Sequence, residues 1–129
     1  MGLRGTVSVG LPTTTSIFHR DINYSDAINE AVDEFMDAAT SDVPVDTGTL
    51  QASISCEKVY MGFIAYADTN YAEYVEYGTY KMEAQPYFKD NLESVAEELH
   101  ANCVQIWQNA EQQDKERYQA LVEDQMKEA

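Results

Sequence analysis

The chain contains, at residues 86–110, the stretch PYFKDNLESVAEELHANCVQIWQNA, in which apolar residues recur every three or four positions. This spacing predicts one face of an amphipathic helix, and Pro86 suits its first turn. The apolar positions are Phe88, Leu92, Val95, Leu99, Cys103, Ile106 and Ala110. After residue 110 a weaker stripe continues through Tyr118, Leu121, Val122 and Met126. We therefore expect a long C-terminal helix with a helical extension over residues 111–129.

The length of this helix has a consequence for assembly. Unbroken, it would have about 40 residues and a length of about 60 Å. A compact domain of 129 residues has a radius of gyration of about 14 Å, so the helix would extend past its own fold. Either the helix bends near Asn109, or its end rests on a neighbouring subunit.

A second helix is expected over residues 25–40, where apolar residues also follow helical spacing. They are Ile28, Val32, Phe35, Met36 and Ala39. Ser25 is a candidate N-cap, and Pro44 prevents the helix from continuing. The following residues Asp46, Thr47 and Gly48 are interpreted as a turn leading into a sheet, because Asp46 can accept backbone hydrogen bonds and Gly48 can take a positive φ.

The predicted sheet contains a hairpin with strands near residues 50–60 and 63–67, joined at Met61 and Gly62. The residues sharing a face would be Ile54, Cys56 and Tyr60 on the first strand, and Phe63, Ala65 and Ala67 on the second. Residues 1–24 are expected to form an extended arm or an edge strand, since Val7, Val9 and Leu11 alternate with polar residues. Residues 25–110 would form the core of a single domain.

Residues 71–80 fit two interpretations. A helix would place Tyr71, Tyr74 and Val75 on one face, whereas a strand would align Tyr71, Val75 and Tyr77 with Glu73. Gly78 suits the end of a helix better than the interior of a strand, so we favour a short helix.

The charge of the chain excludes several classes of partner. It has 8 Lys and Arg residues against 23 Asp and Glu residues, a formal net charge of −15. Binding to a nucleic-acid backbone or an anionic membrane depends on basic residues, so neither is expected. No apolar run is long enough for a membrane helix, and residues 1–20 do not resemble a signal peptide. The two cysteines, Cys56 and Cys103, are interpreted as buried thiols.

The sequence predicts no catalytic, cofactor or metal site. His100 and Cys103 are three residues apart, but zinc needs about four ligands and no second pair is present. Glu73 and Glu76 flank tyrosines and superficially resemble a glycosidase pair, although acids between aromatic residues are usually the solvated face of an amphipathic segment. No nucleophile motif or phosphate-binding loop is present.

Tyrosines are concentrated in one part of the chain. Seven of the 9 tyrosines are Tyr60, Tyr66, Tyr71, Tyr74, Tyr77, Tyr80 and Tyr87. Tyrosine is common both in half-buried cores and at protein interfaces, where it offers a large contact area and a polar tip. We expect a mixture of the two roles.

Three stretches in order resemble a known family. Residues 43–54, VPVDTGTLQASI, are similar to the motif P-V-D-T-G-x-L-x-x-S-I, and residues 71–79, YAEYVEYGT, to Y-A-x-Y-V-E-x-G-T. Lys81 and Met82 followed by residues 84–88, AQPYF, are similar to K-M-x-A-Q-P-F. This ordered combination resembles the tail-component family of long-tailed bacteriophages typified by gene product ten of phage HK ninety-seven. The resemblance covers roughly residues 25–105.

The resemblance implies an α+β fold, in which a small antiparallel sheet is packed by an N-terminal helix and a long C-terminal helix. It also implies a non-enzymatic virion protein of the neck that acts in tail completion or head–tail joining. Such proteins form homo-oligomeric rings, commonly hexamers, around the DNA channel and contact neighbouring neck and tail proteins.

Structural roles follow for the motif residues. Asp46, Thr47 and Gly48 would fix the turn, and Pro86 and Phe88 would anchor the long helix. A combined core and interface element would consist of Tyr71, Tyr74, Glu76, Tyr77, Gly78 and Thr79. An acidic channel would let genomic DNA pass without specific binding, although excess acid also favours solubility.

Three alternatives stay open. The first is a tail terminator. An acidic DNA-mimic inhibitor would need its carboxylates in a regular row, whereas here they are mixed with Lys115, Arg117 and Lys127. A cell-wall hydrolase of the tail tip would rest on Glu73 and Glu76 alone.

Overall fold

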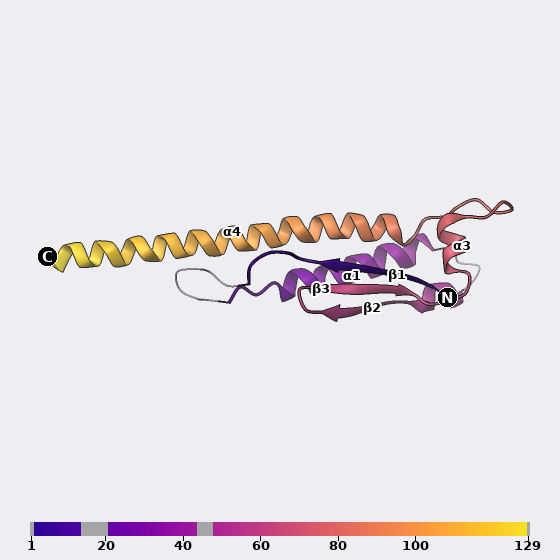
Figure 1. Cartoon of the computed structure of the whole chain (residues 1–129), viewed down its shortest axis with the longest axis horizontal. Helices are drawn as coiled ribbons and strands as arrows, with labels where there is room; N and C mark the ends of the chain where they lie inside the picture. The colour runs from indigo at the N-terminus through magenta and orange to yellow at the C-terminus, as the bar shows by residue number, and fades with distance from the viewer. Residues whose placement is uncertain (1, 14–20, 44–47, 129) are drawn as a thin grey trace.

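The fold is built on a small antiparallel sheet with the strand order β1-β3-β2 (Figure 1). The strands are β1 (Leu3–Ser8), β2 (Ile54–Val59) and β3 (Gly62–Ala67). The computed structural model describes residues 2–13, 21–43 and 48–128. Asp46 and Thr47 of the predicted turn therefore lie outside the described residues.

Strands β2 and β3 form the predicted hairpin, but its turn lies one residue earlier than expected. Val59 pairs with Gly62, so Tyr60 and Met61 make the two-residue connection, with Met61 at φ 59°. Glycine is required at position 62 by the close approach of β1 and not by the turn, because a Cβ there would lie 1.9 Å from the carbonyl oxygen of Val7 on β1. Tyr60 lies in the turn and outside β2, so the prediction that it shares a strand face with Ile54 and Cys56 is wrong.

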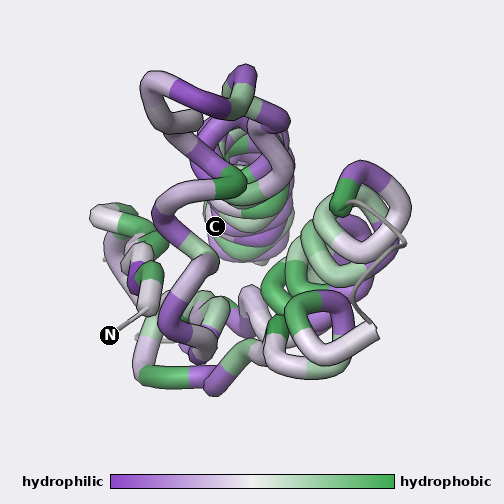
Figure 2. Tube along the Cα trace, turned by 90° about the vertical axis from the view of Figure 1, so that its right-hand side faces the viewer, coloured by the Kyte–Doolittle hydropathy of each residue, from purple (hydrophilic) through white to green (hydrophobic). Residues whose placement is uncertain are grey.

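Two helices, α1 (Ser25–Asp42) and α4 (Lys89–Glu128), lie side by side against the sheet, as the end-on view of Figure 2 shows. Helix α1 contacts β2 and β3, while α4 contacts β1. Phe35 of α1 is fully buried, with its ring centroid 6.3 Å from that of Phe63 on β3 and 5.5 Å from that of Phe88. The predicted α+β class is confirmed.

The start of α1 differs in detail from the prediction. Ser25 is the first helical residue instead of the N-cap. The backbone N–H and the hydroxyl of Ser25 donate hydrogen bonds to the Oδ1 of Asn23, at 2.9 Å and 2.6 Å. Asn23 therefore stabilises this end of the helix, because an amide oxygen can satisfy the same unpaired donors. The Tyr24 hydroxyl donates to the carbonyl of Pro12 at 2.8 Å and ties α1 to the segment after β1.

Residues 50–53 were expected to begin a strand, but they belong to the short helix α2 (Gly48–Ser53). Leu50 is fully buried there, and Ile54 follows four residues later in the core. This spacing fits one helical turn as well as strand alternation, so periodicity alone does not separate the two. Gly48 is the first residue of α2, where a Cβ would meet no other atom within 4 Å.

Helix α3 (Ala72–Tyr77) confirms the helical interpretation of residues 71–80. The long helix begins at Lys89, three residues after Pro86, so the prediction that Pro86 lies in its first turn is wrong. Helix α4 then runs without interruption for 40 residues, and it is not broken near Asn109. Figure 1 shows its C-terminal part projecting well beyond the sheet and α1. No helix among the described residues is long and apolar enough to cross a membrane.

Candidate functional site

The buried carboxylate of Glu76 organises the region that carries the motif residues. Glu76 is 4% exposed and lies in the last turn of α3. Its Oε1 accepts hydrogen bonds from the backbone N–H groups of Tyr87 and Phe88, both at 2.8 Å, and its Oε2 accepts one from Lys89 at 2.9 Å. Amides at the start of a helix lack partners within it, and the helix dipole favours a negative charge there. Glu76 is therefore the N-terminal cap of α4.

This cap contradicts the expectation that the acids between the tyrosines form a solvated face. Glu73, on the same helix, is exposed as expected, whereas Glu76 is not. Both oxygens of Glu76 are already bonded to main-chain donors. In the sequence, the sign of this role is an acid placed before Pro86 and the start of a helix. The carboxylate and the amides that it caps are 11 to 13 residues apart, so a local capping motif does not include both.

Tyr87 completes the connection between α3 and α4. It is fully buried, and its hydroxyl donates to the carbonyl of Ala72 at 3.1 Å. Burial, together with the nearby Glu76 charge, raises the pKa of Tyr87. The backbone N–H of Gln85 donates to the carbonyl of Val75 at 2.8 Å. The start of α4 is thus fixed to α3 by side-chain and main-chain bonds.

Gly78 ends α3 with a φ of +76°, a conformation in which a side chain is strained. A Cβ there would lie 2.7 Å from the backbone nitrogen of Ala84 and 2.9 Å from the carbonyl oxygen of Met82. After Gly78, Thr79 and Met82 exchange backbone hydrogen bonds and close a narrow loop. Gly78 is therefore required both for its φ and for the close return of this loop.

The structure divides the predicted core and interface residues into two groups. Glu76 and Phe88 are buried, and Tyr71 is half-buried against the core. Tyr74, Tyr77, Thr79 and Pro86 are exposed. The motif residues thus lie close together along α3 and its loop, but only some of them belong to the core.

The exposed residues of this region form what we call the tyrosine patch, defined as Tyr74, Tyr77, Tyr80 and Met82. Tyr80 is 93% exposed, and the Nζ of Lys81 lies 5.4 Å from its ring centroid. All four lie on α3 or in the loop that follows it, and large apolar side chains exposed on neighbouring residues often mark an interaction surface.

A second set, in which three residues are exposed and Val122 is half-buried, lies on the projecting end of α4. We call it the helix stripe, defined as Tyr118, Leu121, Val122 and Met126. Met126 is 73% exposed and Leu121 50%, and Val122 lines a shallow hollow together with Tyr118 and Glu123. This stripe continues the apolar face that α4 presents to α1 closer to its start.

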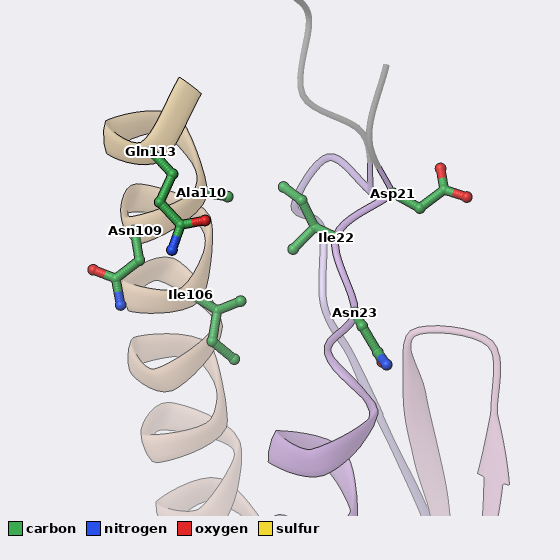
Figure 3. Close-up of a pocket in the computed structure, with 7 residues that line it drawn as sticks. All are labelled: Asp21, Ile22, Asn23, Ile106, Asn109, Ala110 and Gln113. Atoms are coloured by element: carbon green, nitrogen blue, oxygen red, sulfur yellow. The ribbon is translucent and has the colours of Figure 1, made fainter. Parts of the chain in front are cut away.

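A hollow of about 310 Å³ marks the place where α4 leaves the body (Figure 3). Its two walls are residues 21–23 and the α4 segment that contains Ile106, Asn109 and Gln113. In Figure 3 Ile22 points toward α4, while Asp21 and Asn23 point away from it. Among the described residues the lining is aliphatic and amide in character, apart from Asp21, whose carboxylate points away from α4.

The cysteines are both free thiols, with Cys103 buried and Cys56 half-buried. Burial raises the pKa of Cys56 to about 11 and also raises the pKa of Cys103. Within residues 2–13, 21–43 and 48–128, no group of three or more His, Cys, Asp or Glu side chains could hold a metal ion.

Comparison with known families identifies the central part of the chain. Residues 18–78 match the model of a family described as "Bacteriophage HK97-gp10, putative tail-component". This match agrees with the phage tail-component family that the motifs predict. The tail-component match runs through α1, α2, the hairpin and α3, and it ends at Gly78. No curated protein and no solved structure matches the chain.

Proposed function

We propose that this phage tail component is a structural subunit of the neck, acting in tail completion or head–tail joining as part of a homo-oligomeric ring around the DNA channel. The observation that carries the proposal is the projecting end of α4, which exposes an apolar stripe that the described part of the chain leaves uncovered. A second subunit or a neighbouring tail protein would cover it. A hexamer is the stoichiometry that the family resemblance favours.

The proposed role is structural and not enzymatic. Glu76 was one of two carboxylates that a cell-wall hydrolase would need, and its oxygens are occupied by three main-chain N–H groups. Glu73 alone cannot supply both a general acid and a second carboxylate. The region that carries the motifs therefore supports a shape-forming function.

The acidic composition supports passage of DNA without binding. With a net charge of −15, a ring of several copies would repel the phosphate backbone wherever its carboxylates line the channel. Mapping the charge on the assembled ring tests this point, since a neutral or basic channel would contradict it. We place the protein in the virion, after assembly in the cytoplasm of the bacterial host.

Electron microscopy of lysates from a phage with this gene deleted tests the proposal. Filled heads beside free tails of normal length are the expected result, because joining or completion would fail after both parts are built. Free tails of irregular, overlong length would instead indicate a tail terminator. Intact infectious virions would contradict a role in assembly and favour the DNA-mimic alternative.

A further inference from the structure

The two exposed apolar surfaces lie at opposite ends of the molecule. The tyrosine patch belongs to α3 and the loop before α4, at the right of Figure 1, whereas the helix stripe lies near the C-terminus, at the left. Helix α4 separates them over its 40 residues, a length of about 60 Å. The patch and the stripe of one chain therefore cannot cover each other.

We infer that the helix stripe of one copy packs on the tyrosine patch of a second copy. The inference rests on the proposed ring, and it names the contact that builds that ring. A contact between two different surfaces is heterologous, so every copy supplies one of each, and the chain of contacts closes into a ring if the rotation allows. Self-pairing of the stripe would instead give closed dimers and leave the patch exposed.

The available area is sufficient for such a contact. On the patch, Tyr74, Tyr77 and Tyr80 are each more than half exposed and offer on the order of 400 Å² of aromatic surface, taking 150–250 Å² for a buried ring. Leu121, Val122 and Met126 add aliphatic surface. A standard interface buries about 800 Å² on each partner, so the three rings supply about half of it and the side chains around them would supply the rest.

Charge complementarity favours the same pairing. Lys81 stands beside the ring of Tyr80, and Lys89 begins α4 next to the patch. They are two of only 8 basic residues in the chain. Glu123 lines the hollow beside Tyr118 and Val122, so it is the acidic side chain of the stripe that would pair with Lys81 of the patch.

Mixing two variants tests this contact in the full-length chain. Tyr77→Asp disables the patch and leaves the stripe intact, whereas Leu121→Asp does the reverse. Both positions are at least half exposed, so folding should be unaffected, which far-UV circular dichroism checks. Tyr60→Asp is the matched control, because Tyr60 is 82% exposed at the hairpin turn and lies outside both surfaces. The mass of the species is read by light scattering or mass photometry.

We expect each of the two variants alone to weaken self-association by about 30-fold or more, the effect of removing an interface hot spot. The control should associate like the wild type. An equimolar mixture of the two variants should form 1:1 dimers and grow no further, because one intact patch meets one intact stripe.

Four outcomes would overturn the inference. In the first, the mixture of the two variants stays monomeric, and in the second, both variants assemble normally. In the third, Leu121→Asp loses assembly but Tyr77→Asp does not. In the fourth, the wild-type chain stays monomeric at every concentration. Normal assembly of both variants would reject this contact while leaving a ring in place. The proposed function is tested separately by deletion of the gene, and intact virions after the deletion would contradict it.

Discussion

The two ends of α4 belong to one continuous helix, yet they are stabilised differently. Residues 89–110 bury Val95, Leu99 and Cys103 against α1 and the sheet, and their first amides are capped by Glu76. Residues 115–128 expose Leu121 and Met126. Both segments carry apolar residues at helical spacing, so the sequence pattern predicts a helix in each but not what covers it.

This comparison shows where helical stability comes from. An isolated helix of about 14 residues is marginal in water, because most helical stability in proteins comes from packing of an apolar face. The extension avoids the cost of nucleation since it grows from a helix that is already formed. Among the described residues it nevertheless lacks the packing that holds the first half, so under the proposed contact its full stability would come from a second copy.

The same substitution in the two halves should have very different effects. Leu99 is 1% exposed and Leu121 is 50% exposed. Leu99→Ala should lower the free energy of unfolding by about 2–5 kcal/mol, the cost of a cavity in a core. Leu121→Ala should change it by less than about 0.5 kcal/mol in the monomer. Urea denaturation measures both, and equal losses would contradict the comparison.

Removing the cap should loosen the first half of α4 specifically. Glu76→Ala leaves the buried amides of Tyr87 and Phe88 without an acceptor, at a cost of about 2–4 kcal/mol. Glu73→Ala on the same helix is the matched control, because Glu73 is exposed, and it should be close to neutral. Thermal unfolding followed by circular dichroism checks the pair. A neutral Glu76→Ala would show that the cap is dispensable.

Gly78→Val tests whether the C-terminus of α3 requires a glycine at a positive φ. The positive φ and the contacts of a Cβ with Ala84 and Met82 should destabilise the chain by about 1–3 kcal/mol and impair assembly. Gly10→Val is the control, since a Cβ at Gly10 meets nothing within 4 Å. Unfolding midpoints and particle yield are the measurements. Normal stability and normal particles would count against the requirement for glycine.

The smallest effect concerns acids where α1 faces α4. A hydrogen bond with Glu98, some desolvation and the charges of Glu98 and Glu30 raise the pKa of Glu34. The folded chain therefore holds this proton more tightly than the unfolded chain, and the resulting stabilisation is present at low pH and is lost as the pH rises through the folded pKa. Glu34→Gln should reduce the change in the free energy of unfolding across this pH range by about 0.5 kcal/mol or less, because solvent screens the pair.

Stability curves between pH 4 and 7 measure this difference. Glu97→Gln, at an exposed position next to Glu98, serves as the control. A steeper pH dependence in Glu34→Gln than in the wild type would mean that the folded chain does not raise the pKa of Glu34.

Much of the fold could be predicted because its signals are local. The spacing of Ile28, Val32 and Phe35 predicts α1, and the position of Gly78 decides between helix and strand for α3. Phe63, Ala65 and Ala67 share a face of β3 as predicted, and that face is buried. In each case the deciding contacts lie within a few residues in sequence.

The remaining features depend on contacts between distant residues. Gly62 is needed where β1 passes close to β3, and nothing near it in sequence signals that approach. Glu76 caps a helix that begins 13 residues later, so an acid that looks solvated is buried. The stretch from Gly48 to Ser53 fits both a helix and a strand locally, and packing of Leu50 decides the outcome.

Hydrogen exchange read by mass spectrometry tests the central claim, that the body folds on its own while the end of α4 needs a partner. In the monomer, amides of residues 115–128 should exchange orders of magnitude faster than those of residues 92–106, because unpacked helix ends open at little cost. In the assembled state the same amides should become protected. Protection of residues 115–128 equal to that of the body in the monomer, or no gain on assembly, would contradict the account.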